Sequence, residues 1–319
     1  MIDIKLKENS SIDMDELLKL IISQKSNELG RELSADESTK ITIQLEQILN
    51  SFVRKSFLAY EKGELVGWLG VNQVYPPTLL LYTYHPIINP DSNRKHVAQA
   101  LIQKCIDYAI EKNIGNIRIF NDVTIKTENR FLELEQYYLN AGMKKTHIVL
   151  CMENKLSTNV IKNTVIDSEY HIEPWLDQSD EDLKECYERI FAKSNDNFTN
   201  SLDKEERNYW NTISRGNANQ ASIVIKKDNE LVALILAVDY GDFMELGPIG
   251  VVPEHRGKKL GKVVMEECLS SLFKQGKVNC YLEVDATNTP AINLYKSYGF
   301  FEVSKKHGFL WRSMGKSWV

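Results

Sequence analysis

Apolar and polar residues alternate along the chain with two periods, one typical of strands and one typical of helices. A period of two predicts a first strand at residues 2–6, and apolar residues at every third or fourth position predict helices at 10–33 and 34–52. Ser34 and Glu37 have the spacing of a capping box, which supports the start of the second helix. The other elements predicted in this half are a hairpin at 57–71 that turns at Lys62 and Gly63, strands at 78–84, 114–120 and 146–152, and helices at 97–109 and 129–141.

The second half of the chain repeats this order of elements. Glu64–Gly67 matches Glu230–Ala233, and the stretch 138–143 falls opposite 295–300, so an internal duplication is the simplest account. The elements predicted here are strands at 169–174, 245–252 and 280–284, helices at 180–192, 203–214 and from Leu260 to a cap at Gly276, a hairpin at 221–238 that turns at Asp228 and Asn229, and a short helix that ends at Gly299.

A polar tract at 154–168 separates the two patterns and has the composition of a linker. The chain length of 319 residues suits two domains of ordinary size. We therefore predict domains at residues 1–155 and 156–319.

Composition and charge exclude several classes of protein. Hydrophobic residues at 43% and charged residues at 26% describe a globular chain, and a net charge of -5 argues against broad binding to nucleic acid or to anionic membranes. The five cysteines show no pairwise spacing, so we expect reduced core residues and neither zinc nor disulfides. The first residues form no apolar signal segment, and the longest apolar run, 231–238, is too short to span a bilayer. A cytoplasmic location is expected.

A basic turn between the strand at 245–252 and the following helix is the first candidate for chemistry. The backbone N–H groups of such a turn and the positive end of the helix dipole converge on one point, which favours an anion. Gly257 and Gly261 let a phosphate approach the backbone, and Arg256, Lys258 and Lys259 add positive charge. An ordinary solvated turn is the alternative. The spacing of the glycines fits neither the P-loop nor the dinucleotide-binding motif.

Three motifs in order resemble the GNAT superfamily of acyl-CoA-dependent N-acyltransferases. Residues 249–253 resemble its fourth strand, 256–261 its pyrophosphate loop, and 282–300 its final motif, with Lys259 where the loop usually has its middle glycine. The resemblance implies an α/β (α+β) protein of two tandem GNAT-like domains, each a mixed, mostly antiparallel sheet flanked by helices. It also implies acetyl-CoA (coenzyme A) as cosubstrate and no metal.

The resemblance implies a binding site for acetyl-CoA in the second domain. In the first domain the matching loop, 93–98, contains no glycine and has His96 at its middle position, so we expect a degenerate domain there. The cofactor-binding residues implied for the second domain are Ile249, Gly250, Val251, Arg256, Gly257, Lys258, Lys259, Leu260, Gly261 and Asn288.

Acetyl transfer to an amine requires a base, an oxyanion donor and an acid. Tyr295 is the candidate acid, because a phenol with a pKa of about 10 can protonate a departing thiolate, and the family commonly uses this tyrosine. Glu245 and Glu283 are both candidate bases, directly or through water, and the sequence does not choose between them. The backbone N–H of Val251 is the candidate oxyanion donor. Each of these residues could instead be a satisfied structural residue.

We thus expect an N-acetyltransferase that moves an acetyl group from acetyl-CoA to a primary amine by direct attack. A non-catalytic acyl-CoA sensor or interaction module is the alternative. The acceptor, a small molecule or a peptide amine, and the oligomeric state are not predicted.

Overall fold

A computed structural model describes residues 2–51, 54–75, 78–124, 126–157, 164–192, 201 and 218–313. The chain divides into two compact units. The first unit comprises Met1–Thr146 and His307–Trp318, and the second unit comprises His147–Lys306. The domain boundary between residues 155 and 156, which separates the two sequence repeats, stays a prediction. The predicted helix at 203–214 lies outside the described residues.

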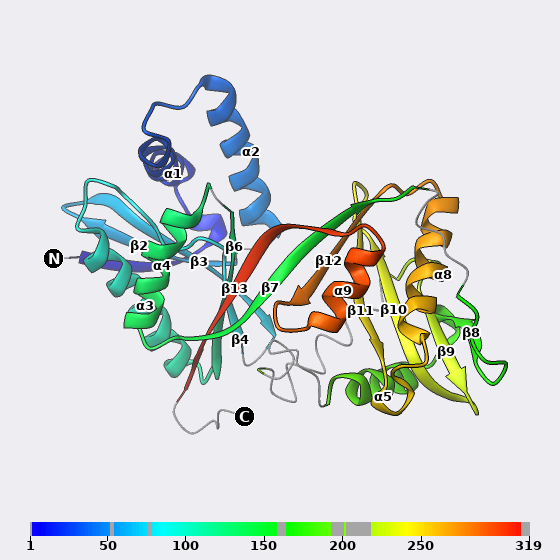
Figure 1. Cartoon of the computed structure of the whole chain (residues 1–319). Coiled ribbons are helices and arrows are strands. Elements are labelled where there is room, and N and C mark those ends of the chain that lie inside the picture. The colour runs from blue at the N-terminus through cyan, green and yellow to red at the C-terminus, as the bar shows by residue number, and fades with distance from the viewer. Residues whose placement is uncertain are drawn as a thin grey trace. The chain divides into compact units, whose positions relative to one another are not determined.

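The first unit contains a mixed sheet in the order β1-β2-β3-β4-β6, followed by the end of β13, with β5 added to β3 (Figure 1). Strands β1 and β2, β2 and β3, β3 and β4, and β3 and β5 pair antiparallel, whereas β4 and β6 run parallel. The elements are β1 (Ile2–Glu8), a 3-10 turn (Asn9–Ser11), α1 (Met14–Leu29), α2 (Ala35–Ser51), β2 (Lys55–Glu61), β3 (Glu64–Tyr75), β4 (Thr78–Leu81), β5 (Ile87–Ile88), α3 (Arg94–Glu111), β6 (Asn116–Val123) and α4 (Glu128–Asn140).

The second unit contains a mixed sheet in the order β13-β7-β12-β11-β10-β9-β8, and β11 and β12 run parallel (Figure 1). Helix α8 packs on β9, β10 and β11, and α5 packs on β10 and β11. The elements are β7 (Lys144–Lys155), β8 (His171–Pro174), a 3-10 turn (Trp175–Asp177), α5 (Asp180–Phe191), β9 (Ile223–Lys227), β10 (Glu230–Asp239), β11 (Met244–Val251), a second 3-10 turn (Pro253–His255), α8 (Leu260–Lys274), β12 (Asn279–Asp285), α9 (Thr289–Ser297) and β13 (Phe301–Arg312).

Strand β13 contributes to both units. Its residues up to Lys306 belong to the second unit, and its residues from His307 belong to the first. The sheet of the first unit therefore includes residues from the far end of the sequence, which the succession of predicted elements does not indicate.

Several local structures follow directly from the residues that build them. Both hairpin turns have two consecutive residues with positive φ, Lys62 with Gly63 and Asp228 with Asn229, which matches the right-handed twist of the flanking strands. The predicted capping box is confirmed, because Ser34 and Glu37 each accept a hydrogen bond from the other's backbone N–H, at 3.3 and 2.9 Å. The two-unit α/β fold predicted from the sequence is also confirmed.

The core of the second unit is built from alternate residues of its strands and from α8 and α9. Cys280, Leu282 and Val284 of β12 are buried in it, together with Tyr295 and Tyr298 from the α9 region. The cysteines at positions 105, 151, 186, 268 and 280 are buried and free, which confirms their prediction as reduced core residues.

Candidate active site

Strand β11 leaves its neighbour β12 halfway along its length. The two strands pair only from Met244 to Leu246, opposite Cys280 to Leu282, whereas β11 continues along β10 as far as Val251. Three residue steps on β11, from Leu246 to Ile249, face two steps on β10, which is the pattern of a β-bulge. Gly247 and Pro248 are the residues of β11 that lie within this bulge, and the second half of β11 has an open edge toward β12.

Two backbone N–H groups of β11 point toward this open edge. Val252 donates from its N–H to the carbonyl of Val232 at 2.9 Å, so these two residues form a hydrogen-bonded pair of the antiparallel ladder. Hydrogen-bonded and non-hydrogen-bonded pairs alternate along such a ladder. Val251 and Ile249, opposite Ala233 and Ile235, are consequently in non-hydrogen-bonded positions, and their N–H groups face away from β10.

The side chains of the basic turn tie it to the rest of the unit. Arg256 donates from Nε to the carbonyl of Val251 at 3.1 Å and from Nη2 to the carbonyl of Ile190, at the end of α5, at 2.9 Å. Lys258 donates from Nζ to the hydroxyl of Tyr170 at 3.1 Å, and that hydroxyl also lies 2.9 Å from Nδ1 of His255. These two cations thus position the turn, and His255 takes part in the same group of contacts.

Two residues of the basic turn have a left-handed backbone conformation. Gly257 and Lys259 have φ values of 80° and 65°, and Lys259 is the residue before the first turn of α8. A left-handed conformation suits glycine and costs a lysine about 1 kcal/mol. Leu260, the first residue of α8, is buried, so the N-terminus of the helix is anchored in the core beside the turn.

Helix α9 lies next to the basic turn. A Cβ atom on Gly261 would lie 3.6 Å from Cδ2 of Leu294, an ordinary contact distance, so α9 lies directly beside the turn at this position. Asn288 is the N-cap of α9 and accepts a hydrogen bond from the N–H of Ala291 at 3.3 Å. Tyr295, the residue after Leu294, is buried, and its ring centroid lies 6.3 Å from that of Phe300.

The two candidate bases lie on one face of the sheet. Glu245 of β11 is in register with Tyr281 of β12, and Glu283 follows Tyr281 by two residues, so the three side chains share a face. The hydroxyl of Tyr281 donates to Oε1 of Glu283 at 2.8 Å, and Nζ of Lys306 forms an ion pair with the same oxygen. By register, Glu283 is nearer than Glu245 to the N–H groups of Ile249 and Val251.

The electrostatic environments of the two carboxylates differ. Burial raises the pKa of Glu245, and the negative charge of Glu283 raises it further, while the hydroxyl of Tyr240 and the charge of Lys306 act in the opposite direction. Glu283 keeps 32% of its side chain exposed and has the ammonium group of Lys306 as a direct partner. Of the two, Glu245 is the carboxylate whose environment favours acceptance of a proton.

Sequence reasoning missed three residues of this face: Tyr281, Lys306 and Cys151. Tyr281 could have been found, because it stands two positions before Glu283 in a strand and so shares its face. Cys151 of β7 is in register with Glu283, and burial raises the pKa of its thiol. Neither Lys306 nor Cys151 gave a signal, since both depend on strand neighbours that come from distant parts of the sequence.

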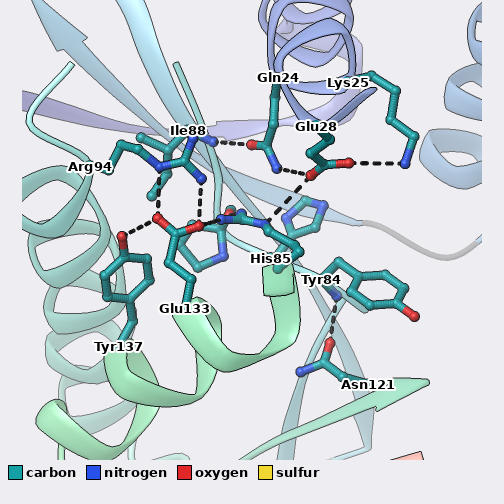
Figure 2. A network of polar contacts seen from close by, with 12 residues as sticks. Gln24, Lys25, Glu28, Tyr84, His85, Ile88, Arg94, Asn121, Glu133 and Tyr137 are labelled. Carbon is teal, nitrogen blue, oxygen red and sulfur yellow. Dashed lines mark hydrogen bonds and ion pairs between the residues drawn. The ribbon is translucent and has the colours of Figure 1, made fainter. Parts of the chain in front are cut away.

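In the first unit β5 pairs with β3 as β11 pairs with β10 in the second. The N–H group that corresponds to that of Val251 is, however, hydrogen-bonded to a side chain of the first unit itself. Ile88 pairs with Gly67 as Val251 pairs with Ala233, and Gly67 and Ala233 are equivalent in the sequence repeat. The N–H of Ile88 donates to Oε1 of Gln24, a buried residue of α1, at 2.7 Å (Figure 2).

Charged side chains fill the neighbourhood of Gln24 in the first unit. Its Nε2 donates to Glu28 at 2.8 Å, and Arg94, in the loop that matches the basic turn, makes two hydrogen bonds with Glu133 at 2.7 and 2.6 Å (Figure 2). Burial alone would raise the pKa of Glu133, but hydrogen bonds from Arg94 and Tyr137 and the charge of Arg130 lower it to about 2. The network is thus ionised and internally paired.

The tyrosine of the first unit that matches Tyr295 is also engaged internally. Tyr138 is fully buried, and its hydroxyl donates to the backbone carbonyl of His85 at 2.5 Å. Burial raises its pKa well above the ordinary value for a phenol. A catalytic acid needs access to the substrate. The phenol of Tyr138 instead donates its proton to a hydrogen bond within the protein.

No helix among the described residues is long and apolar enough to cross a membrane. No group of three or more His, Cys, Asp or Glu side chains in the same residues could hold a metal ion.

The basic turn, the strand before it and helix α9 carry the motifs from which an acetyltransferase was predicted, and a family match supports this class. The profile of the "Acetyltransferase (GNAT) family" matches residues 17–131 and 169–300, which is well over half of the chain and one match in each repeat. The chain belongs to this family as a tandem member and an N-acetyltransferase by family.

Curated relatives match parts of the chain. [Ribosomal protein bS18]-alanine N-acetyltransferase of Salmonella typhimurium is 30% identical over 88 residues, 28% of this chain and 60% of that protein. Streptothricin acetyltransferase of Streptomyces lavendulae is 32% identical over 81 residues, 24% of this chain and 42% of that protein. Mycothiol acetyltransferase of Renibacterium salmoninarum is 41% identical over 56 residues, 18% of this chain and 17% of that protein. The chain thus covers less than two thirds of each relative.

Solved structures share the fold over nearly the whole chain. A GCN5-related N-acetyltransferase from Sphaerobacter thermophilus aligns with a TM-score of 0.62 at 14% identity and covers 98% of this chain and 95% of its own. A tandem GNAT protein from the clavulanic acid biosynthesis pathway aligns with a TM-score of 0.59 at 11% identity and covers 99% of this chain and 100% of its own. At these identities the likeness establishes the fold alone.

Proposed function

We propose that the second unit transfers an acetyl group from acetyl-CoA to a primary amine by direct attack of the amine on the thioester. The observation that carries this proposal is the open edge of β11, where the N–H groups of Ile249 and Val251 face away from β10 next to the basic turn. Such preorganised donors stabilise the oxyanion of a tetrahedral intermediate. The names of three relatives, which acetylate a ribosomal protein, streptothricin and mycothiol, support an amine acceptor in general but select none.

The diphosphate of the cofactor would bind to backbone amides. The side chains of Arg256 and Lys258 are hydrogen-bonded to protein groups, so the amides from Gly257 to Gly261 and the N-terminus of α8 are the donors that remain for an anion. Asn288, as the cap of α9, would contact the same molecule further along its length. When bound, acetyl-CoA supplies the activated acetyl group.

The two carboxylates would divide the work of activating the amine. Glu283, the nearer one to the open edge, would contact the incoming ammonium group, held in place by Tyr281 and Lys306. Glu245, whose environment raises its pKa, would accept the proton directly or through water. The neutral amine then forms the new bond to the acetyl carbon, and the thiolate leaves.

Tyr295 would protonate the departing thiolate. Its neighbour Leu294 lies beside Gly261 of the turn, so α9 places this residue close to the proposed cofactor site. Its burial excludes water, which favours proton transfer within the site.

The test of the enzyme is consumption of acetyl-CoA in the presence of a panel of primary amines, followed by release of free coenzyme A. The enzyme proposal predicts steady turnover with at least one amine. The alternative, a non-catalytic acyl-CoA-binding module, predicts binding of coenzyme A in a calorimeter with no turnover for any amine. No heat on titration with coenzyme A would contradict both.

The first unit would not bind acetyl-CoA. Gln24 accepts the hydrogen bond of the N–H that matches Val251, and the residue two positions before Ile88 is Pro86, which has no N–H. We expect one coenzyme A per chain in calorimetry. Replacement of Gly257 by valine should abolish the binding, whereas replacement of Lys95, in the matching loop of the first unit, should leave it unchanged. Two molecules bound per chain would contradict the division of roles.

A cytoplasmic location is part of the proposal. Five buried, unpaired thiols suit a reducing compartment.

A further inference from the structure

Aromatic side chains are exposed on the face of the second unit that carries the two carboxylates. Tyr240 and Phe243 have 57% and 39% of their surface exposed, and their rings stack at a centroid distance of 5.2 Å with an interplanar angle of 17°. Phe243 also meets Tyr281 edge-on at 5.9 Å. Exposed aromatic clusters of this kind are typical of binding sites rather than of solvated surface.

A pocket of about 510 Å³ adjoins these rings. This volume is in the range of sites for small-molecule ligands, roughly 300–1,000 Å³. The pocket lies where β11 and β12 begin, so the two carboxylates are between it and the open edge of β11. The side chains that the argument uses are Phe243 and Tyr281, which supply aromatic surface, Glu153 and Asp242, which supply negative charge, and Lys155, which supplies one positive charge.

The register of the strands sets the distance from the pocket to the carboxylates. Phe243 immediately precedes β11 and is two residues from Glu245, and Tyr281 and Glu283 are two residues apart on β12, so each carboxylate lies about 7 Å along the chain from a pocket residue. Glu153 of β7 is in register with Tyr281, which makes it the diagonal neighbour of Glu283, at a Cα distance of about 7–8 Å. One face of the sheet thus carries two separate negative positions.

We propose that this pocket binds the body of the acceptor and that the acceptor is a small diamine or oligoamine. This inference rests on the proposed function. One amino group would lie against Glu283 and Glu245 for acetylation. A second, still protonated, would lie on the faces of Phe243 and Tyr281 between Glu153 and Asp242, where cation–π attraction and charge both favour it.

The pocket favours a small molecule over a protein as acceptor. The pocket has two carboxylates and one lysine, so it has a net negative charge that can bind a second ammonium group of the acceptor. The second residue of a peptide need not carry a positive charge. A peptide amino terminus is therefore an outcome of the test that opposes the proposal.

The experiment compares 1,5-diaminopentane with n-pentylamine, which has the same chain length and one charge fewer. With saturating acetyl-CoA, we expect the diamine to have a KM at least 10-fold lower than that of the monoamine. The double variant Glu153→Gln, Asp242→Asn should raise the KM of the diamine about 10-fold and leave its kcat and the KM of the monoamine nearly unchanged. Phe243→Ala should raise the KM of the diamine in the same way. Glu267→Gln, which removes an exposed carboxylate from α8, is the matched control and should change neither.

Binding is measured separately from turnover. Calorimetry with 1,5-diaminopentane on the protein saturated with coenzyme A should give heat in the natural sequence and weaker binding in the double variant. Equal KM values for diamine and monoamine, an unaffected double variant, or a preferred peptide acceptor would each overturn the inference. Diamine binding that depends on Glu153 and Asp242 without any turnover would support the pocket and contradict the proposed enzyme.

Discussion

At the scale of single residues, the second unit places two carboxylates within reach of each other's charge. Glu245 is the more buried and Glu283 the one with a cation beside it, so a proton on this face is more stable on Glu245. Their difference comes from neighbours and not from residue type, which is why the sequence left both open.

Glu245→Gln should lower kcat/KM by about 10²-fold or more, because the proposed proton acceptor is lost. The acidic limb of the pH profile of kcat/KM should disappear with it. Glu267→Gln serves as the control. A kcat/KM within twofold of the natural protein would remove Glu245 from the role of base.

Glu283→Gln should move the acidic limb of that profile to lower pH. The sign follows from the charge: Glu283 raises the pKa of Glu245, so its neutralisation lowers that pKa, and the base is ionised at a lower pH. The KM for the amine should rise as well. A shift to higher pH, or loss of the limb, would assign the proton to Glu283 instead.

Tyr295→Phe should lower kcat by roughly 10²-fold with little change in the Kd for acetyl-CoA, because only the acid is removed. Tyr298→Phe is a matched control three residues away: its hydroxyl donates to Glu266 at 2.7 Å, so its loss should affect stability and spare kcat. Equal kcat values for Tyr295→Phe and the natural protein would contradict the role of acid.

At the scale of elements, the approach of α5 to β11 depends on a glycine. A Cβ atom on Gly250 would lie 2.3 Å from Cγ2 of Ile190, a contact too short to exist, and Ile190 also holds Arg256 of the basic turn through its carbonyl. The position of the turn is therefore coupled to the packing between this helix and this strand.

Gly250→Ala should lower the free energy of unfolding by about 1–3 kcal/mol, because α5 must shift to admit the methyl group. It should also weaken coenzyme A binding through the displaced turn. Gly261→Ala is the control for stability, since its methyl group would meet its nearest neighbour at 3.6 Å, an ordinary contact. Chemical denaturation of both variants measures the difference, and equal stability of the two would contradict the packing argument.

At the scale of the whole molecule, the repeated order of elements was predictable from the sequence, because each element has its own apolar period and turn residues. Asp228 and Asn229 in a hairpin turn and Asn288 as a helix cap are local choices of this kind. The bulge of β11 was indicated by Gly247 and Pro248. The ion pair between Lys306 and Glu283 and the hydrogen bond from Ile88 to Gln24 were not predictable, since each joins residues more than twenty positions apart.

If the chain is divided between residues 155 and 156, the second unit should not fold as a separate fragment. The seven residues from Val149 to Lys155 of β7 are in register with Asp285 to Asn279, and their removal would leave β12 with an unpaired edge. We expect the fragment 156–319 to be insoluble or to lack a cooperative thermal transition, whereas the fragment 144–319, which keeps β7, should be the better folded of the two. A well-folded fragment 156–319 would contradict this.

The shared strand β13 has a consequence for the history of the gene. A stop codon at residue 301 would remove β13, and with it the residues that this strand contributes to the sheet of each unit. Recombination that exchanges one repeat for a foreign copy near this point would leave the other repeat incomplete. Loss of this strand would therefore affect both units together, so we expect the two repeats to be retained or lost as a pair.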